Sequence, residues 1–161
     1  MESTIRAYTE QDADAVIRLS LDAWAPVFAS QRDVMGAEIF ERLHGDDWRR
    51  YQRHSVQSVL AAPGSTVWVA TVGDAVAGFV AAVLHEERRI GEISMLAVAP
   101  EHQRGGIGAK LTSTATEWIR DAGMLVAMVE TGGDSGHAPA RDTYEQAEFT
   151  MVPVARYFKA L

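Results

Sequence analysis

The chain contains no cysteine among its 161 residues. Its composition therefore excludes disulfide bonds, thiolate metal sites and any acyl relay through an enzyme thiol. The five histidines show no ligand spacing with carboxylates or with one another, so we expect no metal site. Any acyl transfer by this chain has to avoid a thioester on the enzyme.

Basic residues are also scarce, with 15 Lys and Arg against 22 Asp and Glu, a net charge of −7 and a pI near 5.2. This balance argues against a nucleic-acid surface, which needs clustered Lys and Arg, and it suits a cationic substrate such as an amine. No apolar run reaches the ~20 residues of a membrane span, and the N-terminus lacks a signal-peptide pattern. We therefore expect a cytoplasmic protein that binds neither nucleic acid nor membranes.

A length of 161 residues with 47% hydrophobic content favours one domain, residues 1–161, with one core. Hydrophobic periodicity and turn residues then predict the order of elements. The first half contains a strand at 3–8, then a helix that starts after the Thr9–Asp12 capping pair and is kinked or ended by Pro26, then a broken helical segment at 27–51 interrupted by Gly36 and Gly45. A hairpin of strands 66–72 and 75–84 and a strand at 90–98 follow. The second half contains a helix closed by Gly123, a central buried strand at 124–129, a helix at 138–147 and a final strand at 150–159.

The most informative segment is Gln103-Arg104-Gly105-Gly106-Ile107-Gly108, which lies between the strand at 90–98 and an amphipathic helix. Its glycines lack the Cβ atoms that would keep an anion away from the main chain. The first N–H groups of the following helix have no internal acceptor, and they lie at the positive end of the helix dipole. Arg104 and Lys110 add formal positive charge. The loop is therefore predicted to bind a pyrophosphate.

Two better-known glycine loops do not fit this segment. A Walker loop requires Lys and then Ser or Thr after its last glycine, whereas Gly108 is followed by Ala109 and Lys110. A dinucleotide fingerprint requires a small residue where Leu111 stands. A nucleoside triphosphate site and a dinucleotide site are therefore both disfavoured.

The pattern Q-x-x-G-x-G behind the strand Gly91–Pro100 resembles that of the GNAT superfamily of acetyl-CoA-dependent N-acetyltransferases, and the order of elements matches over nearly the whole chain. The resemblance implies an α/β (α+β) fold with a mixed, mostly antiparallel sheet of six to seven strands, about four helices and splayed central strands. It also implies direct transfer of acetyl from acetyl-CoA to a primary amine of a small molecule through a ternary complex. A protein amine as acceptor and a non-catalytic acyl-CoA sensor are the alternatives. Family members often pair, so a homodimer is also open.

The resemblance assigns most of the cofactor site. Backbone groups of Leu96, Ala97 and Val98 would bind the pantetheine arm and the acetyl carbonyl. The family pattern N-x-x-A-x-x-x-Y falls on His137 to Tyr144, but this chain contains no asparagine and has His137 in that position. The remaining residues assigned to acetyl-CoA are Gln103, Arg104, Gly105, Gly106, Gly108, Ala109, His137, Ala140 and Arg141.

Two residues are predicted to take part in the chemistry. Glu92 stands where part of the family has its general base, which must remove a proton from an alkyl ammonium at a cost of roughly 4 kcal/mol at pH 7. A salt bridge is the alternative role for this acid. Tyr144 would stabilise the departing thiolate by hydrogen bonding, and a tyrosine of the core is its alternative role.

Three further features need an interpretation. Trp24 and Phe28, with Trp48 and Tyr51, are candidates for an acceptor pocket, although aromatic residues on helices also fill cores. The sequence Gly133–Gly136 matches the segment around the nucleophile of chymotrypsin-like proteases, which we attribute to chance because the chain is too short for that fold. Glu148 replaces a glycine common in the family, and a left-handed backbone there would cost about 1 kcal/mol.

Overall fold

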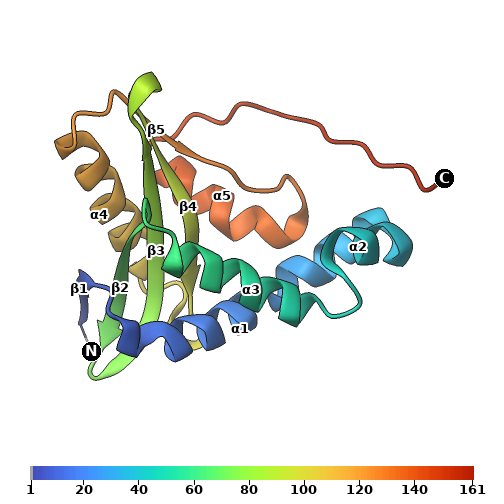
Figure 1. Ribbon diagram of the computed structural model, residues 1–161, viewed down its shortest axis with the longest axis horizontal. Coiled ribbons are helices and arrows are strands. Elements are labelled where there is room, and N and C mark those ends of the chain that lie inside the picture. Colours follow the sequence, from blue (N-terminus) through green and yellow to red (C-terminus); the bar gives the residue numbers. More distant parts are fainter. Residues whose placement is uncertain (1) are drawn as a thin grey trace.

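The computed structural model describes residues 2–161 and shows a five-stranded sheet in the order β1-β2-β3-β4-β5 (Figure 1). The first four strands pair antiparallel, and β5 pairs parallel with β4. The mixed, mostly antiparallel sheet is confirmed, but with five strands among these residues instead of six to seven. The strands are β1 Ser3–Ala7, β2 Thr66–Val72, β3 Ala75–His85, β4 Ile90–Val98 and β5 Val126–Val129.

Helices cover both faces of the sheet, and each face has its own hydrophobic core. The core on one face is made by α1, α3 and side chains such as Phe79 and Ala97. The core on the other face is made by α4 and side chains such as Val80 and Ile93. Because strand side chains alternate between faces, β3 and β4 supply residues to both cores. The helices are α1 Ala13–Met35, α2 Ala37–His44, α3 Trp48–Ala61, α4 Ile107–Asp121 and α5 Ala138–Gln146.

Two glycines allow α4 to lie directly on the strands. A Cβ on Gly78 would lie 2.9 Å from the Ala97 carbonyl oxygen and 3.1 Å from the Leu111 side chain. A Cβ on Gly91 would overlap the side chain of Ile119. The height of α4 above β3 and β4 is therefore set by the absence of side chains at these two positions.

The strand predicted at 124–129 is shorter and less central than expected. Only Val126–Val129 forms β5, which lies at the edge of the sheet. One side of this segment packs into the core beneath α4, but Leu125 and Val126 are 71% and 53% exposed. An uninterrupted apolar run is therefore not covered on both faces here, and the prediction of a central strand is wrong.

The strand predicted at 150–159 is not formed either. These residues have no regular secondary structure and extend away from the sheet (Figure 1), with Val154 84% and Tyr157 90% exposed. Residues of high β-propensity form a strand only where a partner edge supplies hydrogen bonds. Pro153 also lacks the N–H that such pairing uses.

Helix α1 continues through Pro26 to Met35, so of the two predicted effects of Pro26, a kink or an end of the helix, the end is wrong. Pro26 and Asp22 are both exposed, so water can reach the Asp22 carbonyl that has lost its helical donor. The predicted interruptions at Gly36 and Gly45 are confirmed, because both have left-handed φ angles of 82° and 75°. Glu148 is also left-handed, with a φ of 65°.

An ion pair joins β1 to the start of α1. Arg6 donates from its two Nη atoms to the Asp12 carboxylate at 2.7 and 2.8 Å. The Thr9 backbone N–H donates to the same carboxylate at 2.9 Å, as the predicted capping pair requires. These donors hold the pKa of Asp12 at about 2, with Arg6 as the largest cause.

Replacing Asp12 by Asn should reduce the free energy of unfolding at pH 7 by at most about 2 kcal/mol. Because the folded pKa lies below the ordinary value of 3.8, this stabilisation is complete above about pH 5 and is lost as the pH falls towards 2. Urea unfolding should show the difference between wild type and Asp12→Asn narrowing to about half by pH 3. Asp121→Asn, which removes an exposed pair with Arg120, is the control. A difference that stays constant with pH would contradict the ionic origin.

Candidate functional site

Strands β4 and β5 separate halfway along β4. Their parallel pairing covers only Ile90–Ile93 against Val126–Val129, whereas β4 stays paired with β3 as far as Val98. Within residues 2–161, Leu96, Ala97 and Val98 therefore have no strand neighbour on the β5 side. The predicted splay of the strands is confirmed, and it leaves backbone groups of β4 open to a ligand.

A β-bulge lies where the two strands separate. Ser94 has no partner on β3, because Ile93 pairs with Ala82 and Met95 pairs with Ala81. The Ser94 hydroxyl donates to the Ala81 carbonyl at 3.2 Å. An extra residue of this kind bends a strand and increases its twist, which directs the second half of β4 away from β5.

The glycine loop follows β4 after one short 3-10 turn, Pro100–His102. Arg104 and Gly106 have left-handed φ angles of 64° and 83°, and the Gln103 side-chain amide donates to the Val98 carbonyl at 3.0 Å. A Cβ on Gly108 would lie 3.8 Å from Val98 and 3.7 Å from Thr143 of α5. The N-terminus of α4 therefore lies between the end of β4 and α5.

The first N–H groups of α4 are available to an anion. Within residues 2–161, no hydrogen bond is recorded for the backbone N–H groups of residues 105–109, and no side chain caps the helix. The first one bonded is that of Lys110, which donates to the Gly106 carbonyl at 3.0 Å. Such a terminus combines unsatisfied donors with the positive end of the helix dipole. The arrangement can therefore hold a phosphate group.

Lys110 bonds to β1 while remaining beside the glycine loop. Its Nζ donates to the Ser3 hydroxyl at 3.1 Å and to the Ser3 carbonyl at 3.3 Å, so it bonds to β1. It still lines a hollow of about 380 Å³ beside the loop, together with Gln103 and Gly105. Its positive charge thus lies near the glycine loop, on the side of β1.

Tyr144 is buried in α5, and burial raises the pKa of its hydroxyl to about 12. Its ring meets that of Phe149 edge to face at 6.0 Å. With this pKa the phenol is neutral at pH 7 and can donate a hydrogen bond. Full transfer of its proton to a thiolate of ordinary pKa would cost roughly 5 kcal/mol, so donation without transfer is favoured.

The loop between β5 and α5 is attached to α1 by a polar network that the sequence analysis missed. The Ser30 hydroxyl donates to Asp134 at 2.6 Å and accepts from the Gly136 N–H at 3.0 Å. Asp134 also bonds to His137 Nδ1. Burial raises the pKa of Asp134, but the hydrogen bonds from Ser30 and His137 outweigh burial, so the net effect lowers it. Ser30 and Asp134 are 104 residues apart, and no local pattern links them.

This network also bears on two expectations about the loop. Arg141 donates to the carbonyls of Gly132 at 2.6 Å and Asp134 at 2.8 Å, so it supports the loop, and its contact with the cofactor stays a prediction. Ser135 is exposed, and in the part of the chain that the structure describes its hydroxyl has no histidine partner. The geometry gives no support to a protease site at Gly133–Gly136.

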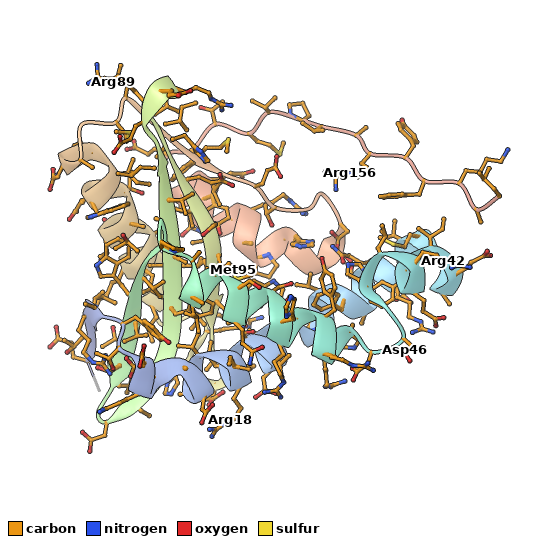
Figure 2. All side chains as sticks on the ribbon, in the orientation of Figure 1. Arg18, Arg42, Asp46, Arg89, Met95 and Arg156 are labelled. Carbon is orange, nitrogen blue, oxygen red and sulfur yellow. The ribbon has the colours of Figure 1, made fainter. Side chains whose placement is uncertain are left out.

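Glu92 lies on the sheet face that carries α1 and α3. Its neighbours Gly91 and Ile93 both pack towards α4, so the side chain between them points to the opposite face. On that same face Met95 packs against the core beneath α1 and α3 (Figure 2). The Glu92 carboxylate lies 2.7 Å from Nε2 of His85, the last residue of β3. No local sequence pattern marks His85, because strand register is needed to place it beside Glu92.

The aromatic candidates for an acceptor pocket have different environments. Phe28 is buried and stacks on Trp48 at 4.8 Å, with His44 edge-on at 5.1 Å, so it joins α1, α2 and α3. Burial lowers the pKa of His44 in this cluster. Trp24 is half-buried and packs against the core of α1 and α3. That Trp24 and Phe28 contact an acceptor stays a prediction.

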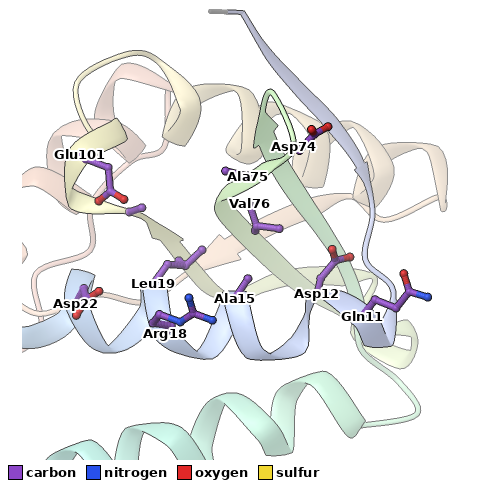
Figure 3. A pocket seen from close by; sticks show the side chains of 11 residues that line it. Gln11, Asp12, Ala15, Arg18, Leu19, Asp22, Asp74, Ala75, Val76 and Glu101 are labelled. Carbon is purple, nitrogen blue, oxygen red and sulfur yellow. The ribbon is translucent and has the colours of Figure 1, made fainter.

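A second hollow, of about 450 Å³, lies between α1 and the β2–β3 turn (Figure 3). Asp12, Asp22, Asp74 and Glu101 make it acidic, with Arg18 as the one basic residue among those lining it. None of its lining residues belongs to the predicted site. Within residues 2–161 no three His, Asp or Glu side chains gather as metal ligands. No helix in the same range is both long and apolar enough to span a membrane.

Comparison with known families gives a clear match. The family model described as "Acetyltransferase (GNAT) family" matches residues 31–149, which is most of the chain. The chain belongs to the GNAT acetyltransferase family. The match begins within α1 and ends at Phe149, so it contains β4, the glycine loop and α5 of this GNAT chain.

Individual relatives agree with this GNAT assignment. A mycothiol acetyltransferase of Pseudarthrobacter chlorophenolicus is 27% identical over 144 residues, which cover 87% of this chain and 40% of the relative. This chain spans only part of its curated relatives. It matches two fifths or less of the length of the mycothiol acetyltransferases of P. chlorophenolicus and Streptomyces bingchenggensis.

Two solved structures show the same GNAT fold. The PaiA N-acetyltransferase of Thermoplasma acidophilum, in complex with coenzyme A, has a TM-score of 0.64 at 15% identity, covering 91% of this chain and 89% of that one. An aminoglycoside acetyltransferase from an uncultured soil sample, in complex with sisomicin, has a TM-score of 0.64 at 18% identity, covering 99% and 96%.

Proposed function

We propose that this chain is an N-acetyltransferase that moves the acetyl group of acetyl-CoA directly to a primary amine of a small molecule within a ternary complex. One observation carries the proposal, namely that the half of β4 left unpaired by β5 leads through the glycine loop to a helix N-terminus whose first N–H groups have no recorded hydrogen bond within residues 2–161. A thioester with a long amide arm and a pyrophosphate needs both features at once. The arm can pair with a strand edge, and the pyrophosphate can bind helix N–H groups.

The residues present fit acetyl-CoA. Leu96, Ala97 and Val98 would pair with the pantetheine arm, and the loop would bind the pyrophosphate through Gln103, Arg104, Gly105, Gly106, Gly108 and Ala109. Glycine at 105, 106 and 108 leaves the main chain accessible, and Gly106 suits its left-handed φ. His137, Ala140 and Arg141 would border the arm from the α5 side. When bound, acetyl-CoA supplies an activated acyl group.

The proposed acceptor is a small amine, in line with the names of similar proteins. Mycothiol acetyltransferases and an aminoglycoside acetyltransferase are named for small molecules. We assign the acceptor to the face of the sheet beneath α1 and α3, where Glu92 lies, with Trp24 and Phe28 on α1 at its border. A net charge of −7 favours the approach of a cationic amine.

Binding and transfer can be tested separately. Calorimetry should detect association of acetyl-CoA and of a desulfo analogue, and an amine library should release free thiol, against which this cysteine-free chain gives no background. Gly105→Asp should weaken acetyl-CoA binding about tenfold or more, because its carboxylate repels the pyrophosphate. Gly64→Asp, where an added Cβ would meet nothing within 4 Å, is the matched control.

The outcomes separate the alternatives. No heat with acetyl-CoA would contradict the whole proposal. Binding without thiol release from any amine would favour an acyl-CoA sensor, and release only with peptide or protein amines would make a protein the acceptor.

Glu92 is assigned as the general base. Glu92→Gln keeps the size and polarity of the side chain but cannot accept a proton, so kcat should fall by on the order of 10²–10⁴ while acetyl-CoA binding persists. Steady-state kinetics with calorimetry checks both quantities. Glu117→Gln, on the exposed side of α4, should leave kcat unchanged. A variant at position 92 with full turnover would remove Glu92 from the mechanism.

Tyr144 is assigned to the leaving thiolate. Tyr144→Phe removes one hydrogen bond to a charged sulfur, which corresponds to a loss of roughly ten- to a hundredfold in kcat. Because the pKa of Tyr144 is about 12, the kcat profile of the wild type should show no tyrosine ionisation below pH 10. Tyr157→Phe, in the exposed segment 150–161, is the control. Unchanged turnover in Tyr144→Phe would return Tyr144 to a packing role.

A further inference from the structure

We infer that His85 transfers to solvent the proton that Glu92 removes from the acceptor amine. This inference rests on the proposed function. His85 Nε2 and Glu92 Oε2 are 2.7 Å apart, within hydrogen-bond distance. In the antiparallel register Val83 faces Glu92 and His85 faces Ile90, so His85 and Glu92 are diagonal neighbours on one face of the sheet.

The exposure of the two side chains gives the pair a direction. The side chain of Glu92 is 28% exposed, and that of His85 is 44% exposed. The carboxylate is therefore the inner member of the pair, and the imidazole is the outer one. An imidazole has two ring nitrogens, so Nε2 can take a proton from the carboxyl group while Nδ1 releases one to water.

Each turnover has two protons to place, and His85 accounts for one of them. The substrate R–NH₃⁺ gives its first proton to Glu92, and the free amine attacks the acetyl carbon. A C–N bond forms and the C–S bond breaks, while the second nitrogen proton ends on the sulfur, so that CoA leaves as a thiol. Once protonated, the Glu92 carboxyl donates to the unprotonated Nε2 of the Nδ1–H tautomer of His85; the first proton passes to Nε2, and the Nδ1 proton goes to water. Exchange with water then restores the starting tautomer.

No neighbouring charged side chain is recorded as bonded to His85 or Glu92 in residues 2–161, so none competes for the proton path from Glu92 to His85. Glu86, Glu87 and Arg88 follow His85 in the β3–β4 connection, and Arg89 donates to the Gly123 carbonyl at 2.8 Å. In residues 2–161 the one recorded side-chain hydrogen bond of His85 is that to Glu92, and the same holds for Glu92. The two side chains thus bond to each other alone, with Glu92 on the side of the sheet and His85 on the side of the solvent.

A relay and a purely structural contact make different predictions for one substitution. His85→Gln retains an amide N–H that can hold the Glu92 carboxylate in place, but an amide cannot carry a proton. A structural role would therefore survive in His85→Gln. A relay would be lost in it, and would return in His85→Ala when imidazole is added from solution.

The experiment measures kcat, KM and acetyl-CoA affinity for wild type, His85→Gln, His85→Ala and Glu92→Gln. We expect kcat of His85→Gln to fall about tenfold or more with KM and acetyl-CoA affinity unchanged, and we expect imidazole to restore His85→Ala in proportion to its concentration. Glu92→Gln combined with His85→Gln should be no slower than Glu92→Gln alone, because both act on one proton. His54→Gln, exposed on α3, is the control and should behave as wild type with or without imidazole.

Each failure has a separate signature. Wild-type kcat in His85→Gln, or no effect of imidazole on His85→Ala, would overturn the relay while acetyl transfer itself stands. Absence of thiol release from wild type with every amine would overturn the proposed function, and the relay with it.

Discussion

The geometry of this molecule depends on how far β4 remains paired with β5. Parallel pairing ends at Ile93, and the next residue, Ser94, is the bulge that turns β4. This separation decides which part of β4 can contact a ligand. The first half of β4 carries Glu92 on a firmly paired strand, and the second half leaves backbone groups free before the chain enters the glycine loop. A sheet paired along its full length would have no such opening.

The electrostatics of the site are local and differ from those of the whole chain. The protein is acidic overall, yet the glycine loop presents backbone N–H groups and the positive end of a helix dipole. On α5, burial keeps the Tyr144 hydroxyl protonated, so it offers a hydrogen bond at the point where we place the leaving sulfur. A chain with negative net charge can thus hold a polyanion at one point and attract an amine elsewhere.

The parts of the fold that were predicted correctly have strong local signals. The strand at 90–98 and the hairpin turn at Gly73 and Asp74 were placed to within a residue, because apolar runs and turn residues mark them directly. The edge position of β5 and the unpaired segment 150–161 were missed, because each depends on whether another strand is present. The backbone at Glu148 is left-handed although the glycine common in the family is absent, an outcome that the sequence left open.

In the candidate site too, features formed by neighbouring residues could be predicted from the sequence, and contacts between distant residues could not. The glycine loop was recognisable because its residues are contiguous. Glu92 and Tyr144 were nominated by family resemblance, and their roles stay predictions. The contact between His85 and Glu92 requires strand register, and that between Ser30 and Asp134 joins residues 104 positions apart. Neither kind of contact leaves a pattern in a short window of sequence.

The close approach of α4 to the sheet bears on protein engineering. Gly78 and Gly91 let the helix lie against the strands, and Gly91 immediately precedes Glu92. Any larger residue at either position would lift α4, and the loop at its N-terminus would move relative to β4. A library designed to change acceptor preference should therefore keep both glycines and place its diversity on α1, α2 and α3, whose packing does not set that height.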